Sequence, residues 1–199
     1  MSYALPRKAQ VWAKPRILDL IKLHRDSDKM RSGIALGSNI GNRLANLREA
    51  YRRVVALNEI GAFIRASSIY ETSPVDCEPG TAEYLNAVME ISFEGPPATL
   101  LDHLLEIEFK MGRPSKRPRN SPRKIDLDIL YVGNLVINNS EIIIPHPRLA
   151  ERRFVLAPLA EIAPDLILPG HSRSVFLLLE ELNNGEEVTK LPQILANDP

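Results

Sequence analysis

Segment 125–132 alternates apolar and polar side chains as a β-strand does when one face lies in a hydrophobic core. Asp126 and Asp128 share the other face, roughly 7 Å apart at their Cα atoms. Two like charges on a half-buried strand repel each other, so a cation is expected beside them, and Mg²⁺ fits best. The alternation predicts Ile125, Leu127, Ile129 and Tyr131 on the core face and Asp126, Asp128, Leu130 and Val132 on the other.

The segment before this strand, 113–124, is a basic stretch interrupted by Pro114, Pro118 and Pro122. These prolines exclude a packed helix or a central strand, so we expect a mobile loop. A solvated surface loop is the ordinary interpretation of such a charge run. The adjacent aspartates favour a loop that closes over phosphates instead. Its basic residues are Arg113, Lys116, Arg117, Arg119, Arg123 and Lys124.

Composition indicates a single hydrophobic core and a protein of a reducing compartment. At 199 residues and 44% hydrophobic content, the chain suits one domain with an appendage. Lys plus Arg and Asp plus Glu both total 25, which disfavours a dedicated nucleic-acid binder. Cys77 is the only cysteine, which suits a reducing compartment. No stretch is apolar enough to span a membrane, so we expect a cytoplasmic protein that binds neither membrane nor nucleic acid.

The two ends of the chain differ from its middle. Residues 1–32 carry a short amphipathic pattern among basic residues, which suggests a docking helix, a targeting segment or a dispensable extension before Met30. We favour an appendage without a catalytic role. Residues 33–183 are expected to form the catalytic domain, and residues 184–199 a polar tail.

The elements between residues 33 and 144 follow the order β-α-β-β-α-β. This order predicts an α+β fold of the ferredoxin-like type, with an antiparallel sheet and its helices on one face. The other sheet face and its loops are then available to a ligand. We expect strands at 34–36, 63–70, 85–93 and 125–132, helices at 44–55 and 97–111, and one or two strands within 136–144.

Three further features bear on a site. Glu108 lies in the apolar stripe of the second helix, where it either pairs with an arginine such as Arg113 or contacts a ligand. His146 lies between two prolines, which hold its imidazole on a rigid segment. The glycine-rich turn 37–41 lacks a phosphate-loop sequence, so turn and helix cap are its expected roles.

Several motifs together resemble one family, the hydroxymethyl-dihydropterin pyrophosphokinases of folate biosynthesis. The resemblance runs from about Gly33 to Pro169. It implies a ferredoxin-like α+β protein that moves the terminal pyrophosphate of ATP onto the hydroxymethyl group of a reduced pterin and releases AMP. The motifs are Gly37-Ser38-Asn39, Ser67 to Thr72, Tyr84-Leu85-Asn86-Ala87, Gly112-Arg113, Pro122 to Asp128, Pro145-His146-Pro147 and Arg152-Arg153-Phe154.

The resemblance also implies a role for each matching residue. Asp126 and Asp128 would hold two Mg²⁺ ions with ATP, and would act in catalysis together with Arg113 and Arg123. The pterin would lie between Tyr84 and Phe154, with Asn86, Thr72 and the backbone at Val75 around its edge. The ATP site would comprise Glu108, Arg113, Arg123, Ile129, His146 and Arg152.

Departures from the family pattern and two alternatives accompany the resemblance. The cationic loop often carries a tryptophan in this family, and Asn120 stands at that place here. An RNA-binding ferredoxin-like module would use Tyr84, Phe154 and the basic loop, although two aspartates would repel phosphates without a metal. A catalytically silent relative is the other alternative. The partners expected for the enzyme are ATP and the pterin, bound by a monomer or weak oligomer.

Overall fold

The computed structural model describes residues 30–73, 82–113, 122–183 and 185–195. Val75, Asn120, the middle of the cationic loop and most of the N-terminal appendage lie outside these residues. Within the described residues, no helix is long and apolar enough to cross a membrane.

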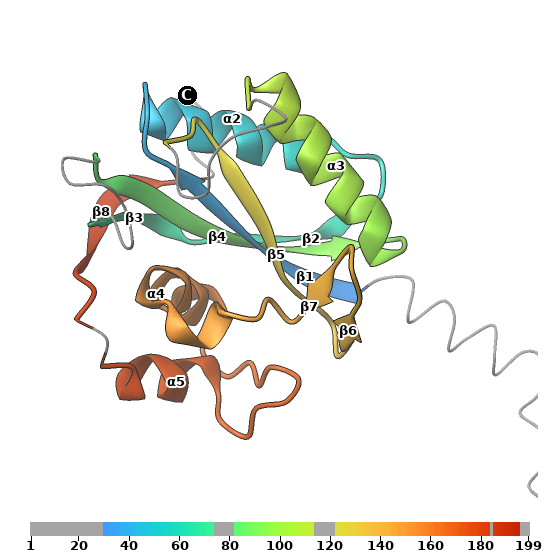
Figure 1. Cartoon of the computed structure of the whole chain (residues 1–199), viewed down its shortest axis with the longest axis vertical. Helices are drawn as coiled ribbons and strands as arrows, with labels where there is room; N and C mark the ends of the chain where they lie inside the picture. The colour runs from blue at the N-terminus through green and yellow to red at the C-terminus, as the bar shows by residue number, and fades with distance from the viewer. Residues whose placement is uncertain (1–29, 74–81, 114–121, 184, 196–199) are drawn as a thin grey trace, which may run out of the picture.

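An antiparallel sheet lies at the centre of the molecule (Figure 1). Its strands follow the order β5-β1-β4-β3-β8, and β2 pairs with β4 beside β3. Ser67 separates β2 from β3, and its N–H donates to the carbonyl of Val88 at 2.9 Å. The strands are β1 (Met30–Ser38), β2 (Ile60–Ala66), β3 (Ser68–Thr72), β4 (Tyr84–Phe93), β5 (Asp126–Val132) and β8 (Val188–Ile194).

Helices α2 (Arg43–Val55) and α3 (Pro97–Lys110) cover one face of this sheet, as the element order predicted (Figure 1). The side chain of Asn42 caps α2 by accepting a hydrogen bond from the Ala45 N–H at 3.1 Å. Pro97 begins α3 in the position where a missing N–H costs least. The ferredoxin-like α+β prediction is confirmed in this half of the molecule.

The second face carries helices that the sequence analysis did not predict. Helix α4 (Arg153–Ile162) lies on it, after the short 3₁₀ turn η1 (Leu149–Glu151), and α5 (Val175–Glu181) packs against α4 on the side away from the sheet (Figure 1). The expectation of helices on one face alone is therefore corrected. Helix α4 is short and contains Pro158, a residue that disfavours a helix interior, so the sequence argues against a helix there. It buries a second apolar cluster, which includes Val88, Leu130, Tyr131, Leu149, Val155, Leu156 and Leu159.

The predicted alternation of β5 holds as far as Leu130 and then fails. The register between β1 and β5 shifts between Gly33 and Ile34, so Ile34 lies opposite Ile129 but Gly33 lies opposite Tyr131. A bulge of this kind changes which face the following side chains meet. Tyr131 therefore joins the α4 cluster and Val132 the α2 and α3 cluster, opposite to the prediction.

The C-terminal residues complete the sheet. The expected polar tail contains β8, which pairs with β3 at the sheet edge, and Leu195 is buried in the core. Pro192 within β8 is compatible with an edge strand. The predicted strands within 136–144 are present as β6 (Ile137–Asn138) and β7 (Ile143–Ile144), which pair with each other.

Candidate active site

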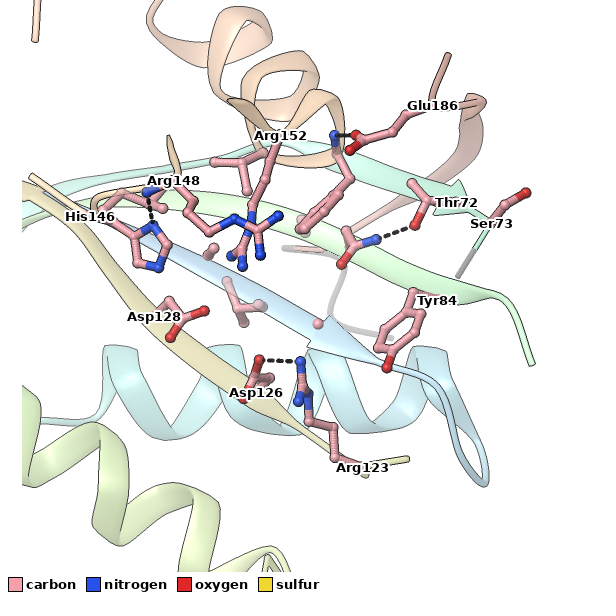
Figure 2. Close-up of a pocket in the computed structure, with 18 residues that line it drawn as sticks. Thr72, Ser73, Tyr84, Arg123, Asp126, Asp128, His146, Arg148, Arg152 and Glu186 are labelled. Atoms are coloured by element: carbon pink, nitrogen blue, oxygen red, sulfur yellow. Dashed lines mark hydrogen bonds and ion pairs between the residues drawn. The ribbon is translucent and has the colours of Figure 1, made fainter. Parts of the chain in front are cut away.

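An open pocket lies between the sheet and the N-terminal end of α4 (Figure 2). The floor comes from β1, β4 and β5, and the opposite wall from the segment that leads into α4. Its chemistry is mixed, because carboxylates, guanidinium groups, aromatic rings and an amide share one space. The lining residues that carry these groups are Thr72, Tyr84, Asn86, Arg123, Asp126, Asp128, His146, Arg148, Arg152, Phe154 and Glu186.

Strand register places the polar groups of the floor. Gly37 lies opposite Asn86 on β4 and Asp126 on β5, so these residues face the same side of the sheet. A Cβ atom on Gly37 would lie 3.1 Å from Oδ1 of Asn86. Gly37 thus belongs to β1 and keeps the floor open, whereas the sequence analysis placed it in a turn.

The turn that follows Gly37 holds the end of the cationic loop. The Asn39 N–H donates to the carbonyl of Arg123 at 3.1 Å, and the Arg123 N–H donates to Oδ1 of Asn39 at 2.7 Å. These reciprocal bonds fix the backbone from which the Arg123 side chain enters the pocket. Asn39 is a positioning residue that sequence reasoning missed, because its partner lies 84 residues further along.

Asp126 is paired with two arginines. Its Oδ2 lies 2.8 Å from Nη2 of Arg123, and its Oδ1 lies 3.3 Å from Nη1 of Arg113. Asp128 makes no ion pair with a cation among the described residues. The buried Nε of Arg123 has no hydrogen-bond partner in the described part of the chain. The pocket therefore holds an unpaired carboxylate and an unsatisfied cationic donor, which an anion and a metal ion together would satisfy.

Glu108 lies behind the ion pair of Asp126 with Arg113 and does not line the pocket. The side chain is 1% exposed, pairs with Arg113, and accepts a hydrogen bond from the Leu127 N–H at 2.8 Å. Burial raises the pKa of Glu108 above its usual range, although Arg113 and the Leu127 N–H oppose this shift. The pairing with Arg113 is confirmed, and a direct contact between Glu108 and a nucleotide stays a prediction.

His146 is held in a neutral form on the opposite side of the pocket. The backbone N–H of His146 donates to the carbonyl of Leu130 at 2.8 Å, and the imidazole Nδ1 accepts from the backbone N–H of Arg148 at 3.2 Å. Burial lowers the pKa of His146 to about 4, helped by the nearby charges of Arg152 and Arg148. At neutral pH its Nε2 therefore carries the proton and can donate a hydrogen bond.

Arg148 and Arg152 place two positive charges beside His146 (Figure 2). Burial lowers the pKa of Arg152, and the charge of Arg148 lowers it further. Two guanidinium groups in one partly buried space favour an anionic ligand between them. Arg148 was not predicted from the sequence, although it follows His146 and Pro147 directly.

Aromatic and amide side chains form the other end of the pocket. The Asn86 amide donates to Oγ1 of Thr72 at 2.7 Å. The Arg152 guanidinium carbon lies 5.5 Å from the Phe154 ring centroid, and that of Arg123 lies 5.9 Å from the Tyr84 ring centroid. Each ring therefore adjoins a cation, so the aromatic end and the cationic end are contiguous.

Most predicted site residues meet in this pocket. Glu108, Arg113 and Ile129 do not line it, and the Ile129 side chain packs in the core beneath α2 and α3. Only the backbone of Ile129 is left to contact a ligand. Val75 lies outside the described residues. The predicted residues that line the pocket are Thr72, Tyr84, Asn86, Arg123, Asp126, Asp128, His146, Arg152 and Phe154.

Fold and site define an α+β protein with a pocket on one sheet face, lined by carboxylates, guanidinium groups and aromatic rings. A model of the family described as 7,8-dihydro-6-hydroxymethylpterin-pyrophosphokinase matches residues 33–164. The chain belongs to this family. It is 47% identical over 131 residues to the Bacillus subtilis 2-amino-4-hydroxy-6-hydroxymethyldihydropteridine pyrophosphokinase, covering 65% of this chain and 75% of the relative.

Other relatives are longer than this chain. The folic acid synthesis protein FOL1 of Dictyostelium discoideum is 34% identical over 179 residues, which are 87% of this chain and 26% of that protein. The chain thus spans about a quarter of that relative. A solved structure of an HPPK-DHPS in complex with substrates matches with a TM-score of 0.59 and 15% identity, covering 77% of this chain and 43% of the other. This likeness supports the fold.

Proposed function

We propose that the chain transfers pyrophosphate from ATP to the hydroxymethyl group of 6-hydroxymethyl-7,8-dihydropterin and releases AMP. The observation that carries this proposal is the single pocket in which Asp126, Asp128 and three arginines adjoin two aromatic rings and an amide. The charged end suits a polyphosphate, and the aromatic end suits a flat heterocycle with polar edges. Membership of the pyrophosphokinase family supports a reaction between a polyphosphate bound at the charged end and a pterin bound at the aromatic end.

The charged end would bind ATP. Arg123, Arg148 and Arg152 would contact phosphate oxygens, and neutral His146 would donate from Nε2. Two aspartates on one strand face suit Mg²⁺, because this ion takes few carboxylates and completes its octahedron with water and phosphate oxygens. Among the described residues no group of three His, Cys, Asp or Glu side chains is placed to hold a metal ion, so Asp126 and Asp128 would be the protein's ligands and the remaining ones would come from phosphate and water. Bound there, Mg²⁺ would neutralise phosphate charge.

The aromatic end would bind the pterin. Tyr84 and Phe154 supply ring faces, and the Asn86 amide and Thr72 hydroxyl supply hydrogen-bonding groups for the edge of the heterocycle. Gly37 leaves space over the floor between these groups and Asp126. The hydroxymethyl group would then point along the floor toward the phosphates.

The reaction would depend on positioning and charge stabilisation. The pterin hydroxyl oxygen attacks the β-phosphorus, a new oxygen–phosphorus bond forms, and the bond from that phosphorus to the α-phosphate oxygen breaks. AMP leaves with this bridging oxygen, and the hydroxyl proton passes to solvent. The arginines stabilise negative charge on the transferred group, and the pocket holds the reactants in line.

The RNA-binding alternative is not favoured. The pocket floor carries two carboxylates, and the family whose model matches is a pyrophosphokinase.

AMP release from ATP and Mg²⁺, measured with and without hydroxymethyl-dihydropterin, tests the proposal. Pterin-dependent AMP release supports the transfer reaction. An absence of AMP in both conditions, together with ordinary ATP binding, would identify a catalytically silent relative.

A further inference from the structure

The N-terminus of α4 is capped by a residue far away in the sequence. Arg152 occupies the N-cap position but makes no side-chain capping bond within the described structure. Instead, Oε2 of Glu186 accepts hydrogen bonds from the Arg153 and Phe154 N–H groups at 2.7 and 3.3 Å. A carboxylate in this position satisfies otherwise unpaired N–H groups and interacts favourably with the helix dipole.

Glu186 belongs to a segment, residues 185–195, that is attached to the fold at its other end. Val188 lies opposite Thr72 in the pairing of β8 with β3, and Leu195 is buried in the core. Glu186 itself lines the pocket, and its bond to the first turn of α4 is visible in Figure 2. The segment therefore links the helix start to the sheet edge.

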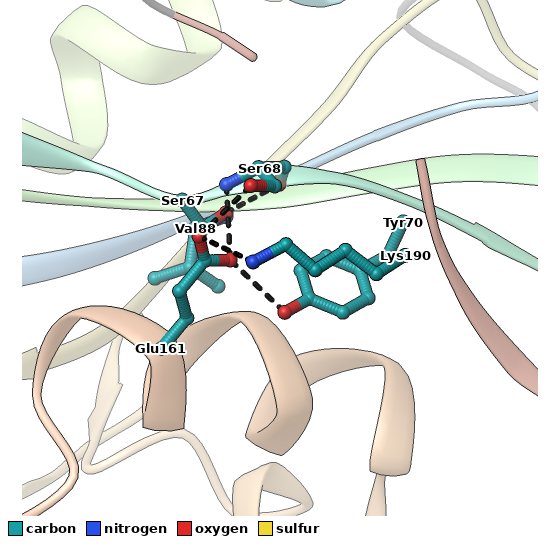
Figure 3. Close-up of polar contacts among 6 residues, drawn as sticks. All are labelled: Ser67, Ser68, Tyr70, Val88, Glu161 and Lys190. Carbon is teal, nitrogen blue, oxygen red and sulfur yellow. Dashed lines mark hydrogen bonds and ion pairs between the residues drawn. The ribbon is translucent and has the colours of Figure 1, made fainter. Parts of the chain in front are cut away.

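The same segment also holds the other end of α4. Glu161 accepts hydrogen bonds from the Ser68 hydroxyl at 2.8 Å and the Tyr70 hydroxyl at 2.9 Å, and its Oε1 lies 3.0 Å from Nζ of Lys190 (Figure 3). Lys190 lies opposite Tyr70 in the pairing of β8 with β3. Helix α4 is thus fixed near both ends by polar contacts that involve residues 186–190.

We propose that residues 185–195 form a strap that positions Phe154 for the pterin through the Glu186 cap. This inference rests on the proposed function, since it assigns Phe154 to the pterin pocket. Glu186 lies beyond residues 33–164, which match the family. It is a positioning residue, because its Oε2 holds the backbone of the residue whose ring forms the pocket wall.

The phosphate end of the pocket depends less on this cap. Arg152 precedes the capped N–H groups, and its own N–H donates to the carbonyl of Leu149 at 3.4 Å. Arg123 and the aspartates are held by β5 and the Asn39 turn. Loss of the cap therefore affects pterin binding more than ATP binding.

Steady-state kinetics of Glu186→Ala, Glu186→Gln and Glu187→Gln test the strap. Glu187 is exposed, so Glu187→Gln removes the same charge from the neighbouring position and serves as the matched control. Glu186→Ala is expected to raise the KM for the pterin about fivefold, the ratio that corresponds to the free energy of a typical helix cap, with a smaller change in the KM for ATP. Glu186→Gln, which retains an acceptor oxygen, should recover part of this loss.

Two results would overturn the inference. One is a pterin KM for Glu186→Ala within about twofold of the Glu187→Gln value. The other is an equal rise in both KM values, which indicates general loosening of the fold. Wild-type protein without pterin-dependent AMP release would instead refute the proposed function, and direct titration of Glu186→Ala with the pterin would then decide whether the cap affects binding.

Discussion

Two arginines, Arg113 and Arg123, form ion pairs with Asp126. Arg113 continues from Asp126 to the buried Glu108, so a chain of charges runs from the core of α3 to the pocket. Arg123 ends this chain on the pocket side. Arg113 pairs with two carboxylates, Glu108 and Asp126, whereas Arg123 pairs with Asp126. Arg123 is therefore the arginine better placed to leave its ion pair with Asp126 and to bind a phosphate instead.

Replacement of Arg123 by alanine should lower kcat/KM by about 10²–10³, as loss of a preorganised charge does in other enzymes. Stability should change by less than about 1 kcal/mol, because no core side chain is lost. Kinetics and urea unfolding measure the two effects. Arg173→Ala removes an arginine outside the pocket as a control, and an Arg123→Ala enzyme with wild-type kcat/KM would contradict the assignment.

His146 gives the protein a specific sensitivity to acid. Its pKa is lowered to about 4 by burial and by Arg152 and Arg148, whereas an unfolded histidine titrates near 6.5. Between these values the unfolded state binds the extra proton, so the free energy of unfolding falls as the pH drops from 6.5 to 4.

Unfolding by urea at pH 7 and pH 5 tests this effect in wild-type protein and His146→Gln. The variant should lose less stability than wild type between the two pH values, because its side chain does not titrate. Equal losses in the two proteins would show that His146 is not held neutral.

Among the elements, sequence patterns predicted α2, α3 and the start of β5, because each buries one regular face. They also predicted β4, in which every second residue is apolar although both faces are buried. They failed where a tertiary contact overrides the pattern. The bulge beside Gly33 moves Tyr131 to the other sheet face, and neither its presence nor its position can be read from alternation. Pro158 disfavours a helix at α4 although it is buried on the apolar face, and β8 is too polar to resemble a buried strand.

Gly33→Ala should destabilise the fold by about 2 kcal/mol, because the new Cβ would lie 2.2 Å from Cε1 of Tyr131. The Tyr131 ring cannot move freely, since its hydroxyl donates to the buried Glu90 at 2.7 Å. Urea unfolding measures the loss.

The matched test repeats Gly33→Ala in a Tyr131→Leu background, where the clash is relieved. Its cost should fall well below that in the wild-type background. The same cost in both backgrounds would contradict the proposed clash.

At the scale of the whole molecule, the site is assembled from segments as far apart as Gly37 and Glu186. Local sequence predicted which residue types carry the chemistry, because aspartate pairs and arginine runs are visible in one segment. It could not predict Asn39 clamping Arg123 or Glu186 capping α4, because those contacts exist only after the sheet has formed. Among the described residues, the pocket is lined both by strands of the sheet and by the segment that leads into α4.

Joint binding of metal and nucleotide should stabilise the whole molecule. Mg²⁺ with a non-hydrolysable ATP analogue at about 100 times its Kd is expected to add about 2.7 kcal/mol, which raises Tm by roughly 5–10 °C. EDTA should remove the metal-dependent part of this rise. Asp126→Ala should lack that part, and Asp165→Ala, at an exposed aspartate outside the pocket, should retain it. A metal-dependent rise of wild-type size in Asp126→Ala would refute the metal assignment.

The proposed enzyme transfers a pyrophosphate, rather than a single phosphate, to the pterin. Mass spectrometry of the products from ATP, Mg²⁺ and hydroxymethyl-dihydropterin distinguishes the two reactions. One pterin diphosphate is expected for each AMP formed. A pterin monophosphate with ADP, or AMP without a modified pterin, would contradict pyrophosphate transfer.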